Sequence, residues 1–360
     1  MKNIKILHTA DLHLDSAFEA LPAGKAAIRR AEQRELLSRL AELARSERAD
    51  IVLLAGDIFD GGGTYFETGA EFVRCLRDMS VPVFIAPGNH DPYDARSPYA
   101  KLDIPQNVRI FTERDVECAE LPELGVRVYG AAFTGSTDGP DITNIRTERA
   151  EGTWNILCAH GEVGFDPVNE QALSASGLDY AALGHIHKTS GLRRSGGTWY
   201  SWPGCPEGRG FDECGEKGIL QIDIDGETVK AGFIPTAARR YEKLRVEPGA
   251  DALAAIRAAL PKDTADDVYK IILTGESFAA PDLAYLRQAL ERDFFALTFS
   301  DETVPPRDLW RRAGEDSLAG RFLRRMQRRI EAAQTEEEKK MLLRAVRCGI
   351  AALEGWEVRL

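Results

Sequence analysis

Three apolar segments in the first 90 residues each run into a polar motif, and this order constrains the fold more than any other feature of the chain. The segments have the length and apolar content of buried strands, and they cover residues 3–8, 50–54 and 81–86. Apolar residues at helical spacing predict helices over residues 25–47 and 66–79, between successive strands. Alternating strands and helices favour a layered α/β core, in which ligands lie outside the carboxyl ends of the strands.

Shorter predicted strands follow from about residue 107. They lie at residues 108–111, 126–129, 154–159, 180–184, 197–202 and 218–223. We expect these strands to form a second sheet, packed face to face on the first with helices outside. The predicted fold class is therefore α/β, with a four-layer α-β-β-α sandwich as its core.

The remainder of the chain predicts two smaller parts. Strands and helices alternate from about residue 241 to residue 299, an order typical of a small βαβαβ module. Apolar residues recur at about every fourth position over 315–353 and predict a helical hairpin, in which Thr335 and Glu338 fit a capping box. We expect three parts: residues 1–245 with the polar motifs, an accessory module at 246–314, and the hairpin at 315–360.

Composition excludes several classes of protein. A chain of 360 residues exceeds the roughly 250–300 residues of a single core, which agrees with more than one part. The net charge of -11 argues against a protein that coats nucleic acid by bulk charge. The six cysteines show no C-x-x-C pair, and the sequence has neither an export signal nor an apolar stretch long enough for a membrane span. We therefore expect a cytoplasmic protein without a membrane partner.

The polar motifs that follow the predicted strands share the residue types of a metal site. They supply seven candidate ligands, which are Asp11, His13, Asp57, Asn89, His160, His185 and His187. Carboxylate and amide oxygens with imidazoles, and without thiolates, suit divalent transition metals such as manganese, iron or zinc. Two such ions about 3.5–4 Å apart need a shared anionic ligand, for which Asp57 is the candidate. The positive charge that remains favours chemistry on a phosphate ester.

These motifs resemble those of the calcineurin-like metallophosphoesterase family, D-x-H, G-D, G-N-H-D/E, H and G-H-x-H, position by position over residues 11–187. The resemblance implies a metallophosphoesterase catalytic domain at residues 1–245, with the module at 246–314 as a cap. It also implies two metal ions that share Asp57. One ion takes Asp11, His13 and His187 in addition, and the other takes Asn89, His160 and His185. By the same resemblance, His90 is the catalytic acid that serves the leaving oxygen, with Asp91 as its orienting partner.

A finer resemblance is to DNA repair nucleases of the SbcD type, in their YhaO-like branch. It is carried by K-I-L-H-T-A-D-L-H-L-D at residues 5–15, by G-D-I-F-D at 56–60 and by Y-S-W-P-G-C-P-E-G-R-G-F-D-E-C-G-E-K-G at 200–218. This resemblance implies a manganese-dependent DNA exo- or endonuclease that uses a hydroxide activated by two metal ions. It further implies a role in double-strand break repair, with DNA and an SbcC-like ATPase as partners, and it leaves a homodimer open.

Some alternatives stay open at this point. Asp60 stands where some of these nucleases have a histidine. A second function therefore stays possible, that of a small-molecule or nucleotide phosphodiesterase or phosphatase of the same superfamily. The intact ligand set argues against a third, an inert binding scaffold. The loop 204–218, with Arg209 and Lys217, is either near the substrate phosphate or only a hairpin. The position of His8, in the strand before Asp11, favours a role in packing or in supporting a metal ligand over direct metal binding. Five arginines between residues 321 and 329 form either a solvated helix face or a docking face for DNA or the ATPase.

Overall fold

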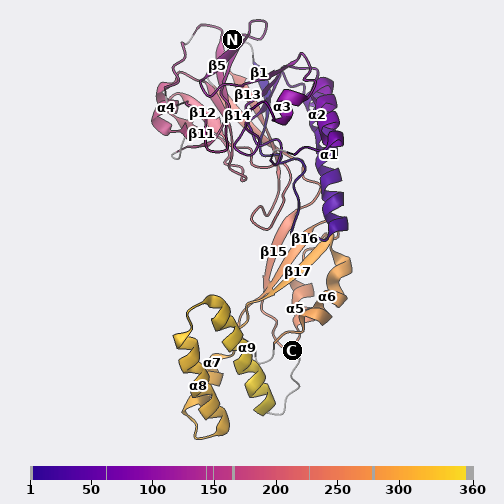
Figure 1. The fold of residues 1–360 in the computed structure, drawn as a ribbon, viewed down its shortest axis with the longest axis vertical. Helices are drawn as coiled ribbons and strands as arrows, with labels where there is room; N and C mark the ends of the chain where they lie inside the picture. Colours follow the sequence, from indigo (N-terminus) through magenta and orange to yellow (C-terminus); the bar gives the residue numbers. More distant parts are fainter. Residues whose placement is uncertain are drawn as a thin grey trace. The chain divides into compact units, whose positions relative to one another are not determined.

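The structure of the chain is a computed structural model, drawn in Figure 1. It describes residues 3–61, 63–142, 144–148, 150–163, 167–226, 228–277 and 280–353. The chain divides into two compact units, Met1–Arg240 and Tyr241–Leu360.

The first sheet of unit Met1–Arg240 contains the three predicted N-terminal strands. Its strands are β1 (Ile4–Thr9), β2 (Ile51–Leu54), β3 (Val83–Ile85), β4 (Val108–Ile110), β13 (Gly218–Asp225) and β14 (Thr228–Pro235). They lie in the order β14-β13-β1-β2-β3-β4, in which β1 to β4 are parallel and β13 is antiparallel to β1. The expectation that residues 108–111 and 218–223 belong to a second sheet is therefore wrong, because β4 and β13 pair with β3 and β1.

The second sheet contains the other short strands that the sequence predicts, together with two that it does not. Its strands are β5 (Glu117–Leu121), β6 (Val126–Gly130), β7 (Trp154–His160), β10 (Tyr180–Gly184), β11 (Arg193–Ser195) and β12 (Thr198–Ser201), in the order β11-β12-β10-β7-β6-β5. β7 is parallel to both of its neighbours, β6 and β10. Two short strands, β8 (Glu162–Val163) and β9 (Pro167–Val168), pair outside this sheet.

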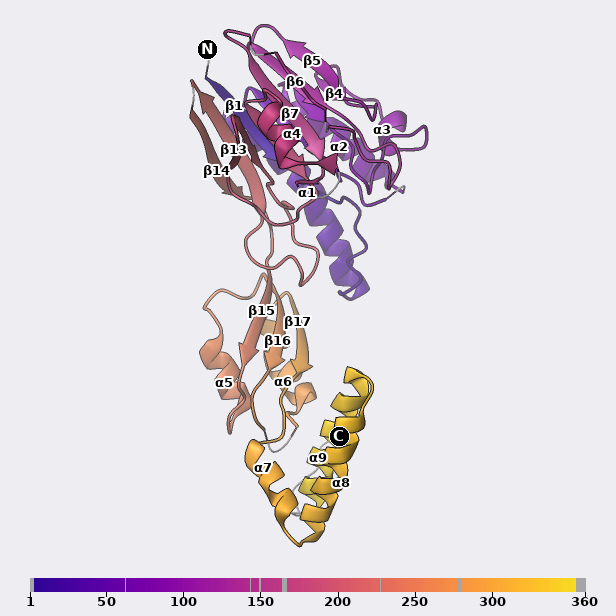
Figure 2. The same cartoon turned by 90° about the vertical axis from the view of Figure 1, so that its left-hand side faces the viewer.

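Three apolar clusters separate the layers of this unit. The cluster between the two sheets includes Ile6 from β1 and Ile156 from β7. Leu7, the next residue of β1, faces the opposite way and packs in the cluster with α1 (Ala23–Ser46) and α2 (Phe66–Met79), which lie along one side in Figure 1. A third cluster covers the outer face of the second sheet and includes Leu173 of α4 (Glu170–Ala175). Helix α4 lies over β7 in Figure 2. The predicted four-layer α/β core is thus confirmed. A one-turn helix, α3 (Pro98–Lys101), follows the third motif.

Unit Tyr241–Leu360 begins with the predicted βαβαβ order. It consists of β15 (Tyr241–Val246), α5 (Ala252–Ala259), β16 (Val268–Leu273), α6 (Leu283–Leu290), a 3₁₀ turn (Glu291–Asp293) and β17 (Ala296–Asp301). The three strands form one parallel sheet, whose core includes Ile271 and Leu286. The predicted division of the C-terminal region at residue 314 stays a prediction.

The predicted helical hairpin closes this unit. It follows α7 (Arg307–Arg311) and a 3₁₀ turn (Arg312–Gly314), and it consists of α8 (Leu318–Ala332) and α9 (Glu336–Leu353). The hairpin has its own apolar cluster, in which Leu323 and Val346 are fully buried. Arg347 of α9 binds Asp301, the last residue of β17, at 3.1 Å. No helix in the described part of the chain is both long and apolar enough to cross a membrane.

Candidate metal centre

The backbone at the strand ends adopts a conformation that non-glycine residues rarely use. Asp11, His13 and Asp57 have φ values of 54°, 44° and 51°, and His185 has a φ of 100°. Each such residue costs about 1–3 kcal/mol, and such strain concentrates at functional sites. Hydrogen bonds between the loops that follow β1 and β2 offset part of this cost, since Asp11 N donates to Gly56 O at 3.0 Å and His13 N donates to Asp57 O at 3.0 Å. Predicted ligands therefore lie where the backbone is strained.

The glycines of two motifs make room for His160. A Cβ atom on Gly184 would lie 1.8 Å from Ala55 O and 2.7 Å from His160 Nδ1. A Cβ atom on Gly56 would lie 2.4 Å from the same Nδ1 atom, and Gly56 also has a φ of 86°. The Gly-Asp and Gly-His pairs of the sequence thus reflect close packing around a buried imidazole.

Asp91 fixes the loops that carry Asp57 and Asn89. Its carboxylate accepts hydrogen bonds from the backbone N–H groups of Gly88, Asp57, Ile58 and Phe59 and from the hydroxyl of Tyr99. The prediction that Asp91 orients His90 is wrong, because these contacts direct its carboxylate to the loop backbone. Asp91 instead holds two motifs in register.

The Nε2 atoms of three predicted ligands point toward one another or toward a carboxylate. His13 Nε2 lies 3.2 Å from His187 Nε2. His160 Nε2 lies 3.2 Å from Asn89 Oδ1 and 3.2 Å from Asp57 Oδ2. Asp57 Oδ2 also lies 3.7 Å from His13 Nε2, so this one oxygen reaches both halves of the cluster.

The Nδ1 atoms of the same three rings point outward, each toward an oxygen. The distances are 2.8 Å from His160 to Ala55 O, 2.7 Å from His187 to Glu213 Oε1 and 3.4 Å from His13 to Asp60 Oδ1. A neutral imidazole carries one hydrogen, and an oxygen beside Nδ1 favours the hydrogen there. In a neutral ring the inward Nε2 atom presents a lone pair to the centre of the cluster, where either a proton on that nitrogen or a metal ion would balance the facing acceptors.

Charge within the cluster supports this conclusion. Asp11 and Asp57 are 0% and 2% exposed, and burial raises the pKa of Asp11 to about 6. Burial is the largest single influence on Asp57 too and opposes its charge, but the contacts with His160, the charge of His13 and the backbone N–H of His90 together hold the pKa of Asp57 below its usual range. Burial is the largest single influence on His160 and lowers its pKa, but the charge of Asp57, the hydrogen bond to Asp57 and the charge of Asp11 together raise it to about 9. The centre of the cluster attracts positive charge, which fits divalent ions.

Three overlapping groups of side chains bring their ligand atoms within 4.8 Å of one another. The groups are Asp11, His13 and His187; His13, Asp57 and His90; and Asp11, Asp57 and His160. Asn89 joins them through its contact with His160. His185 lies beside them, with its ring centroid 5.3 Å from that of His160 and its backbone N–H donating to Asp11. The structure thus gathers all seven predicted ligands, with His90 adjacent.

Asp60 is the neighbour of His90 that sequence analysis did not identify as such. Its Oδ1 atom lies 3.3 Å from His90 Nδ1, and its Oδ2 atom accepts a hydrogen bond from Ser16 Oγ at 2.7 Å. The hydrogen bond with Asp60 raises the pKa of His90 above its ordinary value. The His90 side chain is 46% exposed and faces solvent, whereas the ligands Asp11, His13, Asp57 and His160 are buried.

The loop 204–218 reaches the cluster. β12 and β13, which flank it, belong to different sheets, so the interpretation of the loop as a hairpin is wrong. Arg209 Nη1 lies 3.9 Å from Asp60 Oδ2, and Lys217 Nζ donates to His187 O at 2.8 Å. Both cations were candidates from the sequence, but Glu213 was not. Its position four residues after Arg209 was the available signal.

His8 lies outside the cluster. It is fully buried, and its Nδ1 atom lies 2.8 Å from the hydroxyl of Tyr180. Burial lowers the pKa of His8 to about 3, so the ring is neutral at pH 7. This contact agrees with the packing role that the sequence favours.

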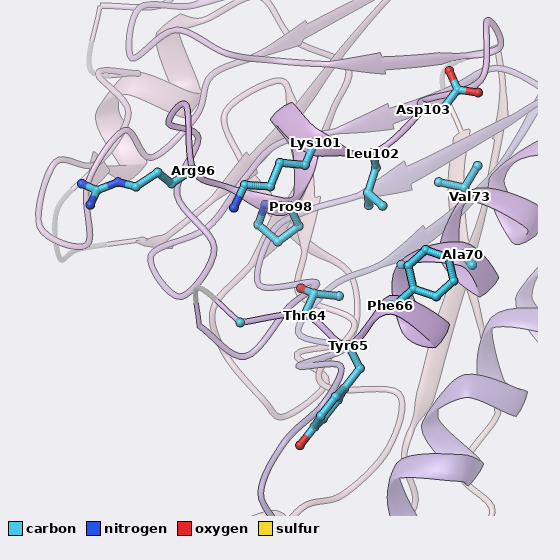
Figure 3. A pocket seen from close by; sticks show the side chains of 12 residues that line it. Thr64, Tyr65, Phe66, Ala70, Val73, Arg96, Pro98, Lys101, Leu102 and Asp103 are labelled. Atoms are coloured by element: carbon cyan, nitrogen blue, oxygen red, sulfur yellow. The ribbon is translucent and has the colours of Figure 1, made fainter.

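A separate cavity of about 680 Å³ lies between the start of α2 and α3. Figure 3 shows Tyr65, Phe66 and Leu102 among its lining residues, with Arg96 and Lys101 nearby. None of the seven predicted metal ligands lines it. The metal centre and this cavity are therefore different sites.

A family model for calcineurin-like phosphoesterases matches residues 4–189, about half of the chain, and the chain belongs to this family. The match includes every predicted ligand from Asp11 to His187. Members of the family hold two divalent metal ions, and the cluster is the candidate site for them.

Curated relatives agree with the predicted SbcD-type, YhaO-like branch. The uncharacterized metallophosphoesterase YhaO of Bacillus subtilis is 27% identical over 264 residues, which cover 69% of this chain and 64% of YhaO. The DNA double-strand break repair protein Mre11 of Aeropyrum pernix is 26% identical over 273 residues, which cover 68% of this chain and 64% of Mre11. One subunit of the SbcCD nuclease of Rhodobacter capsulatus is 31% identical over 139 residues, or 37% of this chain and 28% of the relative. The chain thus spans less than two thirds of the length of these relatives.

Among solved structures, a dimetal phosphatase from Danio rerio matches 65% of this chain and 99% of its own chain. The two are 12% identical with a TM-score of 0.40.

Proposed function

We propose that this chain is a metal-dependent DNA phosphodiesterase, an exo- or endonuclease, with two divalent ions in the cluster. The observation that carries the proposal is the set of inward-facing acceptor atoms around Asp57, whose Oδ2 atom lies 3.2 Å from His160 Nε2 and 3.7 Å from His13 Nε2. A carboxylate oxygen between two histidine groups suits a shared ligand. The proposed ligand sets are those expected from the sequence, with Asp57 common to both.

Two divalent ions supply Lewis acidity at such a site, since they polarise the phosphate and lower the pKa of the attacking water. The residues of the chain do the rest. Asp11 and Asp57 give two buried negative charges, and the strained backbone at both positions holds their side chains in place. Five neutral ligands, one amide and four imidazoles, leave the loaded centre with net positive charge toward an anionic phosphate.

His90 is the proposed catalytic acid. Its side chain is 46% exposed, and its Nδ1 atom lies 3.3 Å from Asp60, which raises its pKa. A protonated imidazole near neutral pH suits protonation of a leaving oxygen. Asp60, rather than Asp91, is its proposed orienting partner.

The choice of DNA as substrate rests on the relatives. Two of them are described as a DNA double-strand break repair protein and as part of a nuclease. By this similarity the proposed cofactor is manganese, with iron or zinc as alternatives, and the proposed partner is an SbcC-like ATPase in double-strand break repair. A cytoplasmic location is part of the same proposal.

The C-terminal unit is the proposed contact region for DNA or the ATPase. Arg321, Arg325, Arg328 and Arg329 of α8 are exposed, while Arg324 turns back to bind the carbonyl oxygens of Ala313 and Glu315. Replacing Arg325 and Arg328 by glutamate should weaken DNA cleavage or ATPase binding and spare hydrolysis of a small chromogenic diester. Replacing the exposed Lys339 and Lys340 of α9 by glutamate is the matched control for charge alone.

Asp60 favours one alternative, a small-molecule or nucleotide phosphodiesterase or phosphatase. A carboxylate beside His90 adds negative charge where some nucleases of this type have a histidine, and it cannot donate a hydrogen bond to a diester. If this alternative is right, Asp60→His should raise the ratio of diester to monoester hydrolysis.

The test is an assay of metal-reconstituted protein on single- and double-stranded DNA labelled at the 5′ or 3′ end, beside small phosphate mono- and diesters. We expect manganese-dependent cleavage of DNA and a loss of about 10²–10⁴-fold in His90→Ala at unchanged metal content. Arg96→Ala, an exposed change in the same loop, is the control. Activity on small esters alone would refute the nuclease, and fewer than one bound ion per chain would support an inert scaffold.

A further inference from the structure

Glu213 is a buried carboxylate that the proposed reaction does not use. It lies in the loop between β12 and β13 and is 4% exposed. Three oxygens lie beside the outward Nδ1 atoms of His160, His13 and His187. The first is the backbone carbonyl oxygen of Ala55, and the second belongs to Asp60, which also contacts His90. The third oxygen, on Glu213, has the shortest of these contacts, 2.7 Å to His187 Nδ1.

His187 depends on this contact more than the other two rings depend on theirs. The side chains of His13 and His160 are 0% exposed, so the surrounding atoms hold their rings. The side chain of His187 is 30% exposed, and packing constrains its ring less. Its Nε2 atom nevertheless points inward, 3.2 Å from His13 Nε2 and 3.8 Å from Asp11 Oδ1. A hydrogen bond at Nδ1 is the interaction that selects this orientation.

Arg209 makes the choice of tautomer critical. Its Nη2 atom lies 3.3 Å from His187 Nδ1 and 2.9 Å from Glu213 Oε1. A guanidinium only donates, so a bond from Arg209 to Nδ1 would require the lone pair there and would place the hydrogen on Nε2. That tautomer cannot bind a metal through Nε2. Glu213 accepts a hydrogen bond from Nη2 of Arg209, and a second one from the backbone N–H of Arg209 at 2.7 Å. These bonds occupy the guanidinium that would otherwise donate to His187 Nδ1.

We propose that Glu213 is a positioning residue that keeps the hydrogen of His187 on Nδ1, leaves Nε2 free for a metal ion, and prevents Arg209 from reversing this arrangement. The role is that of an outer carboxylate in a carboxylate–histidine–metal triad. It rests on the proposed metal centre and adds a residue to it.

The test compares wild-type protein with Glu213→Ala, Glu213→Gln and the double variant Glu213→Ala/Arg209→Met. Manganese is titrated into chelator-treated protein, and affinity and stoichiometry are measured by calorimetry and metal analysis. Glu213→Ala should weaken the binding of one of the two ions by about 10–100-fold, the usual effect of removing an outer-sphere partner. Glu213→Gln should lose less, because its amide oxygen still accepts from Nδ1. The double variant should regain part of the affinity, since the competing donor is gone.

A second readout does not involve metal. Two-bond ¹H–¹⁵N spectra of ¹⁵N-histidine-labelled, metal-free protein report which ring nitrogen of His187 carries the hydrogen. We expect Nδ1 in the wild type and Nε2 in Glu213→Ala. This measurement separates the two proposals: a wild type that binds no manganese would defeat the metal centre, while the spectra would still decide the role of Glu213.

Glu207→Gln is the matched control. Glu207 lies in the same loop, is 1% exposed and binds an arginine, Arg29, at 2.7 Å, much as Glu213 binds Arg209. Its other contact is to the backbone of Ala238 and not to a predicted metal ligand. It should leave manganese affinity unchanged. The proposal is overturned if Glu213→Ala binds both ions within about twofold of wild type, if Glu207→Gln weakens binding as much, or if the tautomer of His187 is the same with and without Glu213.

Discussion

His8 makes the stability of the metal-free protein depend on pH in a way that one substitution should remove. Its ring is fully buried, and its Nδ1 atom lies 2.8 Å from the Tyr180 hydroxyl. Burial lowers the pKa of His8 to about 3 in the folded state, against an ordinary value of 6.5 when unfolded. Between these two pH values His8 is protonated in the unfolded chain and stays neutral in the folded chain. Stability is therefore lost as pH falls below about 6.5.

The magnitude follows from the two pKa values. Each pH unit between them is worth about 1.4 kcal/mol, so the loss from pH 7.5 to pH 5 is about 2 kcal/mol from this residue alone. His8→Asn keeps a polar atom near the Tyr180 hydroxyl and cannot titrate. The variant is expected to be less stable at neutral pH, but its stability should fall less between pH 7.5 and pH 5 than that of the wild type, by about 2 kcal/mol.

The assay is urea unfolding of chelator-treated protein at several pH values. The free energy of unfolding of the variant is subtracted from that of the wild type, so that the contributions of other titrating groups cancel. His90→Asn is a control of opposite sign. The pKa of His90 is raised in the folded state, so His90 adds stability at low pH that is lost as pH rises, and its removal should steepen the acid loss. Parallel pH profiles for wild type and His8→Asn would refute the burial of a neutral imidazole.

Two further perturbations address the loops of the metal centre. Asp91→Ala leaves four buried backbone N–H groups without their acceptor, so it should lower the free energy of urea unfolding by about 3–5 kcal/mol and also weaken metal binding. Tyr99→Phe removes one bond to the same carboxylate and should lower the free energy of unfolding by about 1–2 kcal/mol. Equal losses in the two variants would contradict the role of Asp91. Gly184→Ala places a Cβ atom against Ala55 O and His160 and should abolish metal binding in calorimetry, while Gly24→Ala, with open space in α1, should stabilise by about 0.5–1 kcal/mol. A Gly184→Ala protein that still binds two ions would show that the loop can move aside.

The position of the predicted ligands could be foreseen because parallel strands end at one edge of a sheet. β1, β2 and β3 are parallel neighbours, and β7 and β10 are parallel neighbours in the other sheet. Motifs that follow these strands therefore meet, whatever the details of the loops. The capping box at Thr335 was foreseen for a similar reason, since its N-cap bond is local: Glu338 N donates to Thr335 Oγ1 at 3.1 Å.

The partners of the ligands could not be foreseen, because they depend on how loops far apart in sequence fold against one another. Glu213 meets His187 across 26 residues, and Asp60 meets His90 across 30. Asp91 was expected beside His90 because the two are adjacent in sequence, yet its side chain turns to the backbone of another loop. Sheet membership failed for the same reason: the pattern of 218–223 identifies a strand, but pairing with β1 is a property of the whole fold.

The place of β1 in its sheet has a consequence for how this protein is made and shortened. β1 is synthesised more than 200 residues before β13, yet it lies between β2 and β13, and it stays an open edge until residues 218–225 have left the ribosome. Its apolar residues are exposed to mispairing during that interval, as unprotected sheet edges are. A fragment cut at residue 189, where the family match ends, would retain every predicted ligand and lack the strand that covers β1. Expression of the unit Met1–Arg240 should therefore extend through β14, beyond the last predicted ligand.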